Sequence, residues 1–210
     1  MISADLTGSA GDSPALLAPA KRGWYSRGYL PHRDDEGLIQ FITFRLYDSM
    51  PAELLDVWKE ELRSFPKTKA DSELRSRILK YVDRGHGQCF LRIPAVANLV
   101  QSTLLRFHAE RYELLEWVVM PNHVHVLIEP RLNWSLDGIL HSWKSYTAKK
   151  ANQLLGRRGT FWYREYYDRW IRNEEHYARV VEYIAGNPVK ANLCAAAEEF
   201  PWCSSSYCVC

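Results

Sequence analysis

Apolar residues recur along this chain at two spacings, one typical of strands and the other of helices. Runs rich in β-branched and aromatic residues predict strands over residues 38–46 and 112–119. The next apolar run, residues 117–130, contains the turn signal Met120-Pro121-Asn122. We therefore expect residues 112–119 to form an antiparallel hairpin with the part of the run that follows the turn.

Helical spacing of apolar residues predicts five helices around these strands. They cover residues 54–65, residues 72–82, a segment opened by Ile93-Pro94-Ala95, a segment after the capping signal of residues 133–137, and residues 173–188, which end in Gly-Asn-Pro. The chain is therefore predicted to combine helices with an antiparallel hairpin.

The apolar stripes of the last two predicted helices show which side of each helix should face the core. The first stripe consists of Ile139, Leu140, Trp143 and Tyr146, and the second of Tyr177, Val180, Val181 and Ile184. An aromatic run at residues 161–163 and 166–167 separates the two helices, and we expect most of its rings to be core.

Composition indicates one folded unit with short extensions. The chain has 210 residues, of which 47% are hydrophobic and 25% charged. Residues 1–23, rich in small and polar residues, are expected to be disordered. Residues 24–207 should form a single catalytic domain with a helical insertion around 50–108, followed by the cysteine-containing tail 208–210. The five cysteines, an odd count, are expected to be reduced thiols.

No apolar run approaches the roughly 20 residues that cross a bilayer, and no secretory signal is evident at the N-terminus. We therefore expect a cytoplasmic protein without a membrane partner.

Net charge does not indicate the partner, because the formal value is only +2. The fourth predicted helix is nevertheless basic, and its cations lie beside Trp143 and Tyr146. Such a combination suits single-stranded nucleic acid, with phosphates on the cations and bases on the rings. The alternative is a solvated helix face. The candidate DNA-binding cations of this region are Lys144, Lys149, Lys150, Arg157 and Arg158, and Arg179 and Lys190 of the last predicted helix are further candidates.

His123 and His125 alternate within the predicted hairpin, so both rings should face one side of the sheet. The other side can pack on helices and leave the histidines at an open surface. Two imidazoles can bind a divalent cation, but a working site needs a third protein ligand. Histidines that are simply exposed or hydrogen-bonded in a structural role are the alternative.

The last predicted helix offers Arg179, Tyr183 and Asn187 on one face, each one turn after the last. Asn187 can supply the third metal ligand, which would place Tyr183 one turn from the cation. A phenol with a pKa near 10 needs nearby positive charge to act as a nucleophile, and the metal, Arg179 or Lys190 can provide it. Attack on a phosphodiester would give a covalent phosphotyrosine, which keeps the bond energy for a later joining step. The alternatives are a core tyrosine and a helix-terminating asparagine.

Five motifs together resemble the single-tyrosine transposases with a His-hydrophobic-His motif, and in particular the REP-associated tyrosine transposases. They are G-Y-L-P-H at 28–32, F-I-T-F-R-L at 41–46, W-V-V-M-P-N-H-V-H-V-L-I at 117–128, S-W-K-S-Y-T-A-K-K-A-N at 142–152 and Y-I-A-G-N-P-V-K-A-N-L at 183–193. The resemblance covers most of the chain after the N-terminal tail.

The resemblance implies an α+β fold with a ferredoxin-like antiparallel sheet, Mg²⁺ or Mn²⁺ as cofactor, and cleavage of single-stranded DNA through a 5′-phosphotyrosine. By motif position, the metal ligands fall on His123, His125 and Asn187, and the nucleophile on Tyr183. DNA hairpins from repetitive extragenic palindromes are the implied substrates, with the protein acting as a monomer or dimer. Gly186, the insertion at 50–95 and the cysteine-rich tail depart from the pattern.

Two other functions remain open on the sequence. One is a non-catalytic DNA-binding regulator that keeps the fold, and the other is a metal-dependent hydrolase in which water attacks the phosphate.

Overall fold

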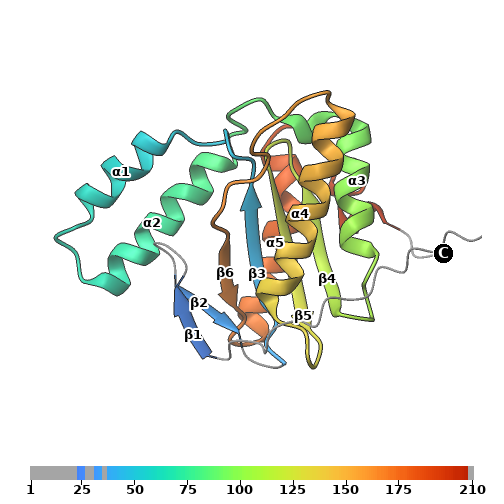
Figure 1. Ribbon diagram of the computed structural model, residues 1–210. Coiled ribbons are helices and arrows are strands. Elements are labelled where there is room, and N and C mark those ends of the chain that lie inside the picture. The colour runs from blue at the N-terminus through green and yellow to red at the C-terminus, as the bar shows by residue number, and fades with distance from the viewer. Residues whose placement is uncertain (1–22, 27–30, 35–36, 208–210) are drawn as a thin grey trace, which may run out of the picture.

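A four-stranded antiparallel sheet with helices on both faces forms the centre of the molecule (Figure 1). The computed structural model describes residues 23–26, 31–34 and 37–207, so residues 1–22 of the predicted tail 1–23 and the whole predicted tail 208–210 lie outside the described residues. The strands are β3 (Gln40–Arg45), β4 (Tyr112–Val119), β5 (His123–Pro130) and β6 (Tyr167–Trp170), in the order β4-β5-β3-β6. This arrangement confirms the predicted α+β fold with an antiparallel ferredoxin-like sheet.

Five helices join the strands, as the sequence predicts. They are α1 (Ala52–Glu61), α2 (Lys67–Val82), α3 (Pro94–Leu105), α4 (Leu136–Leu154) and α5 (Glu174–Lys190). Short 3-10 helices lie at Phe90–Arg92, Ala197–Glu199 and Ser204–Ser206. None of the described helices is both long and apolar enough to cross a bilayer.

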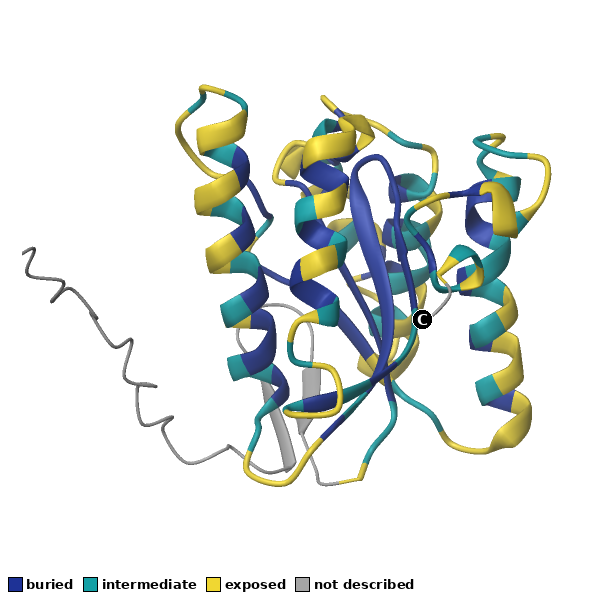
Figure 2. Ribbon diagram, turned by 90° about the vertical axis from the view of Figure 1, so that its right-hand side faces the viewer, coloured by how far each residue is buried: buried dark blue, intermediate teal, exposed yellow. Residues whose placement is uncertain are grey.

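The side-chain alternation of β5 divides the core into two layers. Val124, Val126 and Ile128 pack on the face that α3 and α4 cover, and Leu127 packs on the face that α5 covers. In Figure 1, α4 lies in front of the sheet and α5 behind it. Figure 2 shows the central strands buried, whereas the helices expose their outer sides. The sheet is therefore enclosed on both faces.

Helix α5 continues past the predicted stop at Gly186-Asn187-Pro188 and ends at Lys190. Pro188 has no N–H and cannot donate to the preceding turn. The helix still closes beyond it, because Ala191 N–H donates to the Asn187 carbonyl (3.0 Å) and Leu193 N–H donates to the Pro188 carbonyl (2.9 Å). Asn187 therefore remains helical, one turn after Tyr183.

One other helix boundary and three short strands differ from the prediction. Helix α2 begins at Lys67, directly after Pro66, so residues 67–71, which lie between the two predicted helices, belong to its first turns. The short strands β1 (Gly23–Ser26), β2 (Pro31–Asp34) and β6 were not predicted. Strands of four residues are too short to show a clear alternation of apolar and polar positions.

Tyr146 is 43% exposed, so its assignment to the buried stripe of α4 is wrong. Thr147 and Ala151, which follow Trp143 at spacings of one and two turns, occupy the buried positions instead. The aromatic run behaves as expected. Its buried members are Phe161, Trp162, Tyr166 and Tyr167.

Helices α1 and α2 form a hairpin with its own small core, which includes Leu55, Leu74 and Ile78. The loop after α2 is then attached to the rest of the domain, because the Gln88 N–H donates to the Asp48 carboxylate (2.8 Å). This hydrogen bond attaches the loop to the turn that follows β3.

Gly87 in this loop has a φ of +91°, and a Cβ there would lie 2.7 Å from the backbone oxygen of Asp48. We expect Gly87→Ala to lower the free energy of unfolding by about 1–3 kcal/mol more than Gly156→Ala. Gly156 also has a positive φ, of +60°, but open space around it. Urea unfolding of both variants measures the difference, and equal losses would show that the close approach to Asp48 is unimportant.

Candidate active site

Strand β5 places His123 and His125 on the face of the sheet that α5 covers. Both residues are 0% exposed. The expectation that they lie at an open surface is therefore wrong, because Asp83 at the end of α2 and Tyr183 of α5 lie against them. The two Nε2 atoms are 2.9 Å apart.

Asn122 determines which nitrogen of His123 carries the proton. Its amide nitrogen donates to the carbonyls of Val82 (3.1 Å) and His86 (2.9 Å), so its oxygen faces the imidazole. This oxygen can only accept, and Nδ1 of His123, 2.7 Å away, must therefore donate. Burial, aided by the charge of His125, lowers the pKa of His123 well below its ordinary value. The neutral ring presents the lone pair of Nε2 to the site.

Thr43 of β3 makes the corresponding hydrogen bond to Nδ1 of His125. The two residues lie opposite each other in the sheet, and Thr43 Oγ1 is 2.7 Å from His125 Nδ1. A hydroxyl can donate or accept. When Thr43 accepts, Nδ1 of His125 carries the proton and its Nε2 also offers a lone pair to the site.

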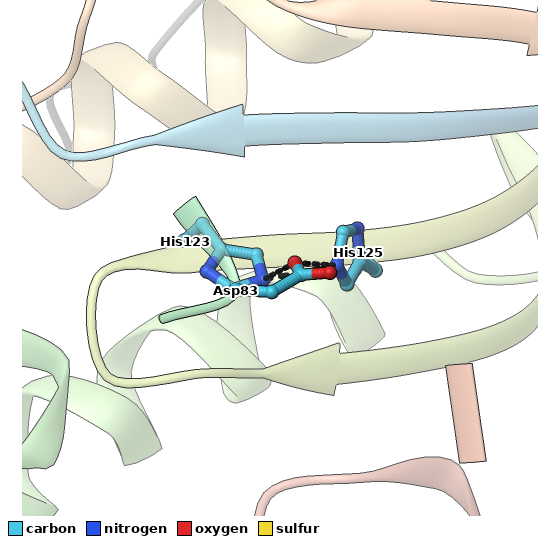
Figure 3. Close-up of side chains that lie close together, drawn as sticks. All are labelled: Asp83, His123 and His125. Carbon is cyan, nitrogen blue, oxygen red and sulfur yellow. Dashed lines mark hydrogen bonds and ion pairs between the residues drawn. The ribbon is translucent and has the colours of Figure 1, made fainter. Parts of the chain in front are cut away.

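Asp83, which directly follows α2, supplies the third group of the cluster (Figure 3). Its Oδ1 lies 3.4 Å from Nε2 of His123 and 3.5 Å from Nε2 of His125. Burial opposes ionisation of this carboxyl, but the hydrogen bond from His125 and the charges of both histidines lower its pKa below the ordinary value. Asp83 is therefore a carboxylate in the folded protein.

These three residues form a candidate site for a divalent metal ion. One ligand atom from each of Asp83, His123 and His125 lies within 4.8 Å of the others. When both imidazoles present a lone pair on Nε2, those lone pairs and the carboxylate face one another and favour a cation between them. Neighbouring oxygen or nitrogen ligands around a small octahedral ion lie about 3 Å apart, and the observed separations of 2.9, 3.4 and 3.5 Å are close to that value. The residues therefore fit such an ion.

Tyr183 lies directly beside this cluster. Its hydroxyl donates to Oδ2 of Asp83 at 2.8 Å and lies 3.4 Å from Nε2 of His125. Burial raises the pKa of the phenol strongly, and the negative charge of Asp83 raises it further. The side chain of Asn187, itself 3% exposed, makes a hydrogen bond to the phenol that lowers the pKa and partly opposes this rise. Tyr183 is therefore protonated in the cation-free site.

The structure thus brings four of the candidate residues together, since His123, His125, Tyr183 and Asn187 lie in one cluster or touch its edge. Asp83 was missed, because it is remote in sequence and no motif connects it to the histidines. The acid that precedes Arg84-Gly85-His86-Gly87, at the end of a predicted helix, is the only local signal.

Two of the basic side chains proposed to bind DNA or to activate the tyrosine, Arg179 and Lys190, lie on α5. Lys190 is close, with Nζ 5.6 Å from the centre of the Tyr183 ring. Arg179 is exposed and forms an ion pair with Glu175.

The remaining candidate cations belong to α4 and the loop after it, on the opposite face of the sheet. Lys144 donates to the carbonyls of Tyr163 and Arg164, both at 2.7 Å. Arg157 lies over the Phe90 ring. Lys149, Lys150 and Arg158 are exposed. These cations do not join the histidine cluster, and their contact with DNA stays a prediction.

Comparison with known proteins agrees with this geometry. The sequence model of the family described as "Transposase IS200 like" matches residues 100–187, the segment that contains His123, His125, Tyr183 and Asn187. No curated protein sequence matches the chain.

Two solved structures are similar. The structure of a REP-associated tyrosine transposase bound to a REP hairpin has a TM-score of 0.51 and 18% identity, and the match covers 86% of this chain and 81% of that chain. This likeness shows that the fold is shared. A putative transposase from Deinococcus radiodurans R1 matches with 16% identity over 78% of this chain and 96% of that chain, but its TM-score of 0.31 is too low to bear on the fold.

The family match spans both histidines and the tyrosine that the fold brings together around Asp83. The segment of the chain that holds the histidine pair and the tyrosine is therefore similar to the transposases described as IS200-like.

Proposed function

We propose that this protein is a metal-dependent transposase that cleaves and rejoins hairpin-bearing single-stranded DNA through a 5′-phosphotyrosine on Tyr183. The observation that carries the proposal is the contact of the Tyr183 hydroxyl with both Asp83 and His125. A nucleophile in contact with the ligands of a candidate metal site can attack a phosphate that the same site binds.

Asp83, His123 and His125 would hold the ion, and Asn187 remains the further ligand suggested by the family motif. Imidazole together with carboxylate oxygen suits Mn²⁺, and Mg²⁺ is the alternative. A bound divalent ion supplies positive charge that polarises the scissile phosphate and favours the phenolate.

In the proposed cleavage step, the phenol oxygen of Tyr183 forms a bond to phosphorus, and the bond from phosphorus to the 3′ oxygen of the preceding nucleotide breaks. Oδ2 of Asp83, 2.8 Å from the phenol, is placed to accept the phenol proton. The departing 3′ oxygen takes a proton from solvent. In the reverse step, a 3′-hydroxyl of another strand attacks the phosphotyrosine and restores the phenol.

Asn187 and Lys190 assist Tyr183 in this scheme. The Asn187 side chain makes a hydrogen bond to the phenol oxygen, and the Lys190 ammonium lies 5.6 Å from the ring. Both interactions favour the phenolate over the phenol. They act against the burial that otherwise keeps Tyr183 protonated.

The proposed substrate is single-stranded DNA that carries a hairpin of the REP type. Support comes from the structure that shares this fold, which contains a REP hairpin, together with the family match. We propose that the protein acts on this DNA in the cytoplasm.

Tyr183→Phe should remove the covalent DNA adduct that wild type forms with labelled hairpin DNA and Mn²⁺. Phenylalanine keeps the ring but lacks the attacking oxygen, so stability should change by only about 1 kcal/mol. Tyr177→Phe on the same helix is the matched control and should retain the adduct. A denaturing gel with mass-spectrometric mapping of the modified peptide measures both.

Each other result on that gel points to another function. Wild-type cleavage without an adduct would indicate water as the nucleophile, and a mobility shift without cleavage would indicate a regulator. An adduct that persists in Tyr183→Phe would assign the nucleophile to a different residue.

Asn122→Leu should weaken Mn²⁺ binding about 10- to 100-fold although no ligand is changed, because His123 loses the acceptor that fixes its proton on Nδ1. Asn152→Leu is the matched control, since Asn152 also donates to a backbone carbonyl, that of Gly159, but lies on α4. Calorimetric titration of both variants with Mn²⁺ gives the comparison. Equal affinities would remove Asn122 from the support of the site.

His123 should also make the metal-free protein less stable in acid. Its pKa is well below 6.5 when folded and near 6.5 when unfolded, so below pH 6.5 the unfolded chain binds one more proton. The free energy of unfolding should therefore fall with decreasing pH from about 6.5 downward, by up to about 1.4 kcal/mol per pH unit from this residue.

Urea unfolding with a chelator present, over a pH series, measures this slope. His123→Gln should show a shallower slope, whereas His141→Gln, at an exposed position of α4, should keep the wild-type slope. Identical slopes for wild type and His123→Gln would contradict the assignment of a buried neutral imidazole.

A further inference from the structure

We infer that a cleft between α2 and β6 binds backbone phosphates of the DNA strand next to the cleavage site, an inference that rests on the proposed function. The cleft has a volume of about 610 Å³. Helix α2 lies beside β6 at the edge of the sheet (Figure 1). The residues that line the cleft and can bind an anion are Thr68, Ser72, Arg75, Ser76, Arg169 and Arg172.

The cleft exists because α2 turns a polar side toward the sheet. Its apolar residues Leu74, Ile78 and Val82 pack in the small core with α1. One side of α2 lines the cleft with four residues at helical spacing. They are Thr68, Ser72, Arg75 and Ser76. A helix that covers a sheet normally buries apolar side chains against it. Small hydroxyl residues leave the space unfilled and offer hydrogen bonds to a polar ligand.

The positive charge of the cleft favours binding of an anion. Three arginines line it, against the single carboxylate of Asp71. Arg169 and Arg172 are exposed, and within residues 37–207 no ion pair joins either of them to an acid. Guanidinium groups bind phosphate oxygens with paired hydrogen bonds. A phosphodiester backbone therefore fits this surface.

Aromatic rings accompany the arginines. The Arg75 guanidinium lies 5.5 Å from the centre of the Tyr167 ring, and that of Arg172 lies 5.3 Å from the centre of the Trp170 ring. Because Tyr167 is buried, its contact with Arg75 helps to hold that guanidinium at the cleft. Burial lowers the pKa of the nearby His176, and the positive charges of Arg169, Arg179 and Arg172 lower it further.

The cleft lies on the same face of the sheet as Tyr183. Arg169 of β6 pairs with Phe41 of β3 in register. The Phe41 ring contacts both Tyr167, which lines the cleft, and Tyr183, with centroid distances of 6.0 and 5.8 Å. Two ring contacts thus separate the cleft from the proposed nucleophile. A strand held at Tyr183 can continue into the cleft, whereas the cations of α4 lie beyond the sheet.

The test measures binding of labelled single-stranded oligothymidylate to the full chain by fluorescence anisotropy over a series of salt concentrations. The Tyr183→Phe background is used, so that binding is measured without chemistry. Arg169→Gln with Arg172→Gln should reduce the slope of log affinity against log salt by about 1.4, because each phosphate contact to single-stranded DNA contributes about 0.7. Arg63→Gln with Arg106→Gln removes two exposed arginines elsewhere and should leave the slope unchanged.

A second pair of variants guards against a folding defect in the arginine variant. Ser72→Asp places a negative charge in the cleft and should weaken binding, whereas Ser102→Asp, at an exposed position of α3, should not. The inference is overturned if the slope of the Arg169/Arg172 variant equals that of its control, or if Ser72→Asp binds as tightly as Ser102→Asp. Neither result depends on whether Tyr183 forms an adduct, so failure of the cleft and failure of the strand-transfer proposal are distinguishable.

Discussion

The partly buried carboxylate of Asp83, whose side chain is 28% exposed, is the constraint on which the rest of the site depends. Removing a carboxylate from water costs several kcal/mol unless other groups stabilise its charge. Tyr183 donates one hydrogen bond to Oδ2, whereas Oδ1 faces the two histidine nitrogens. The same carboxylate thus joins the nucleophile to the candidate metal ligands. A cation bound by the histidines would directly stabilise the negative charge of Asp83. Such a cation would explain why several polar atoms converge at this place.

Four separate segments of the chain must be positioned to make this arrangement. Strand β5 provides both histidines, β3 provides Thr43 to orient His125, α5 provides Tyr183, and α2 ends at Asp83. The sheet fixes the first two segments by backbone hydrogen bonds, and the core beneath α5 fixes the third. Helix α2 packs mainly on α1, and its end is held by Asn122, which donates to the carbonyl of Val82, the last residue of the helix, and to that of His86 in the loop after it. This part of the site depends most on a few polar contacts.

The sequence predicts the parts of the site that local periodicity determines. His123 and His125 alternate on a strand, and Tyr183 and Asn187 follow at one helical turn, so their shared faces could be inferred from spacing alone. Asp83 could not be inferred, because only the tertiary path of the insertion brings it to β5. The burial of the histidines was missed for the same reason. Strand β6 was missed because Tyr167–Trp170 alternates over only four residues.

Because α2 both lines the arginine cleft and ends directly before Asp83, any movement of this helix would change both features together. A ligand that binds the cleft only when α2 lies against β6 stabilises that position of the helix. The same position holds Asp83 against Tyr183 and the histidines. Linkage is reciprocal, so a cation bound by Asp83 and the histidines stabilises the cleft in turn. The inserted helix therefore couples the surface proposed to hold the DNA backbone to the groups proposed to cut it.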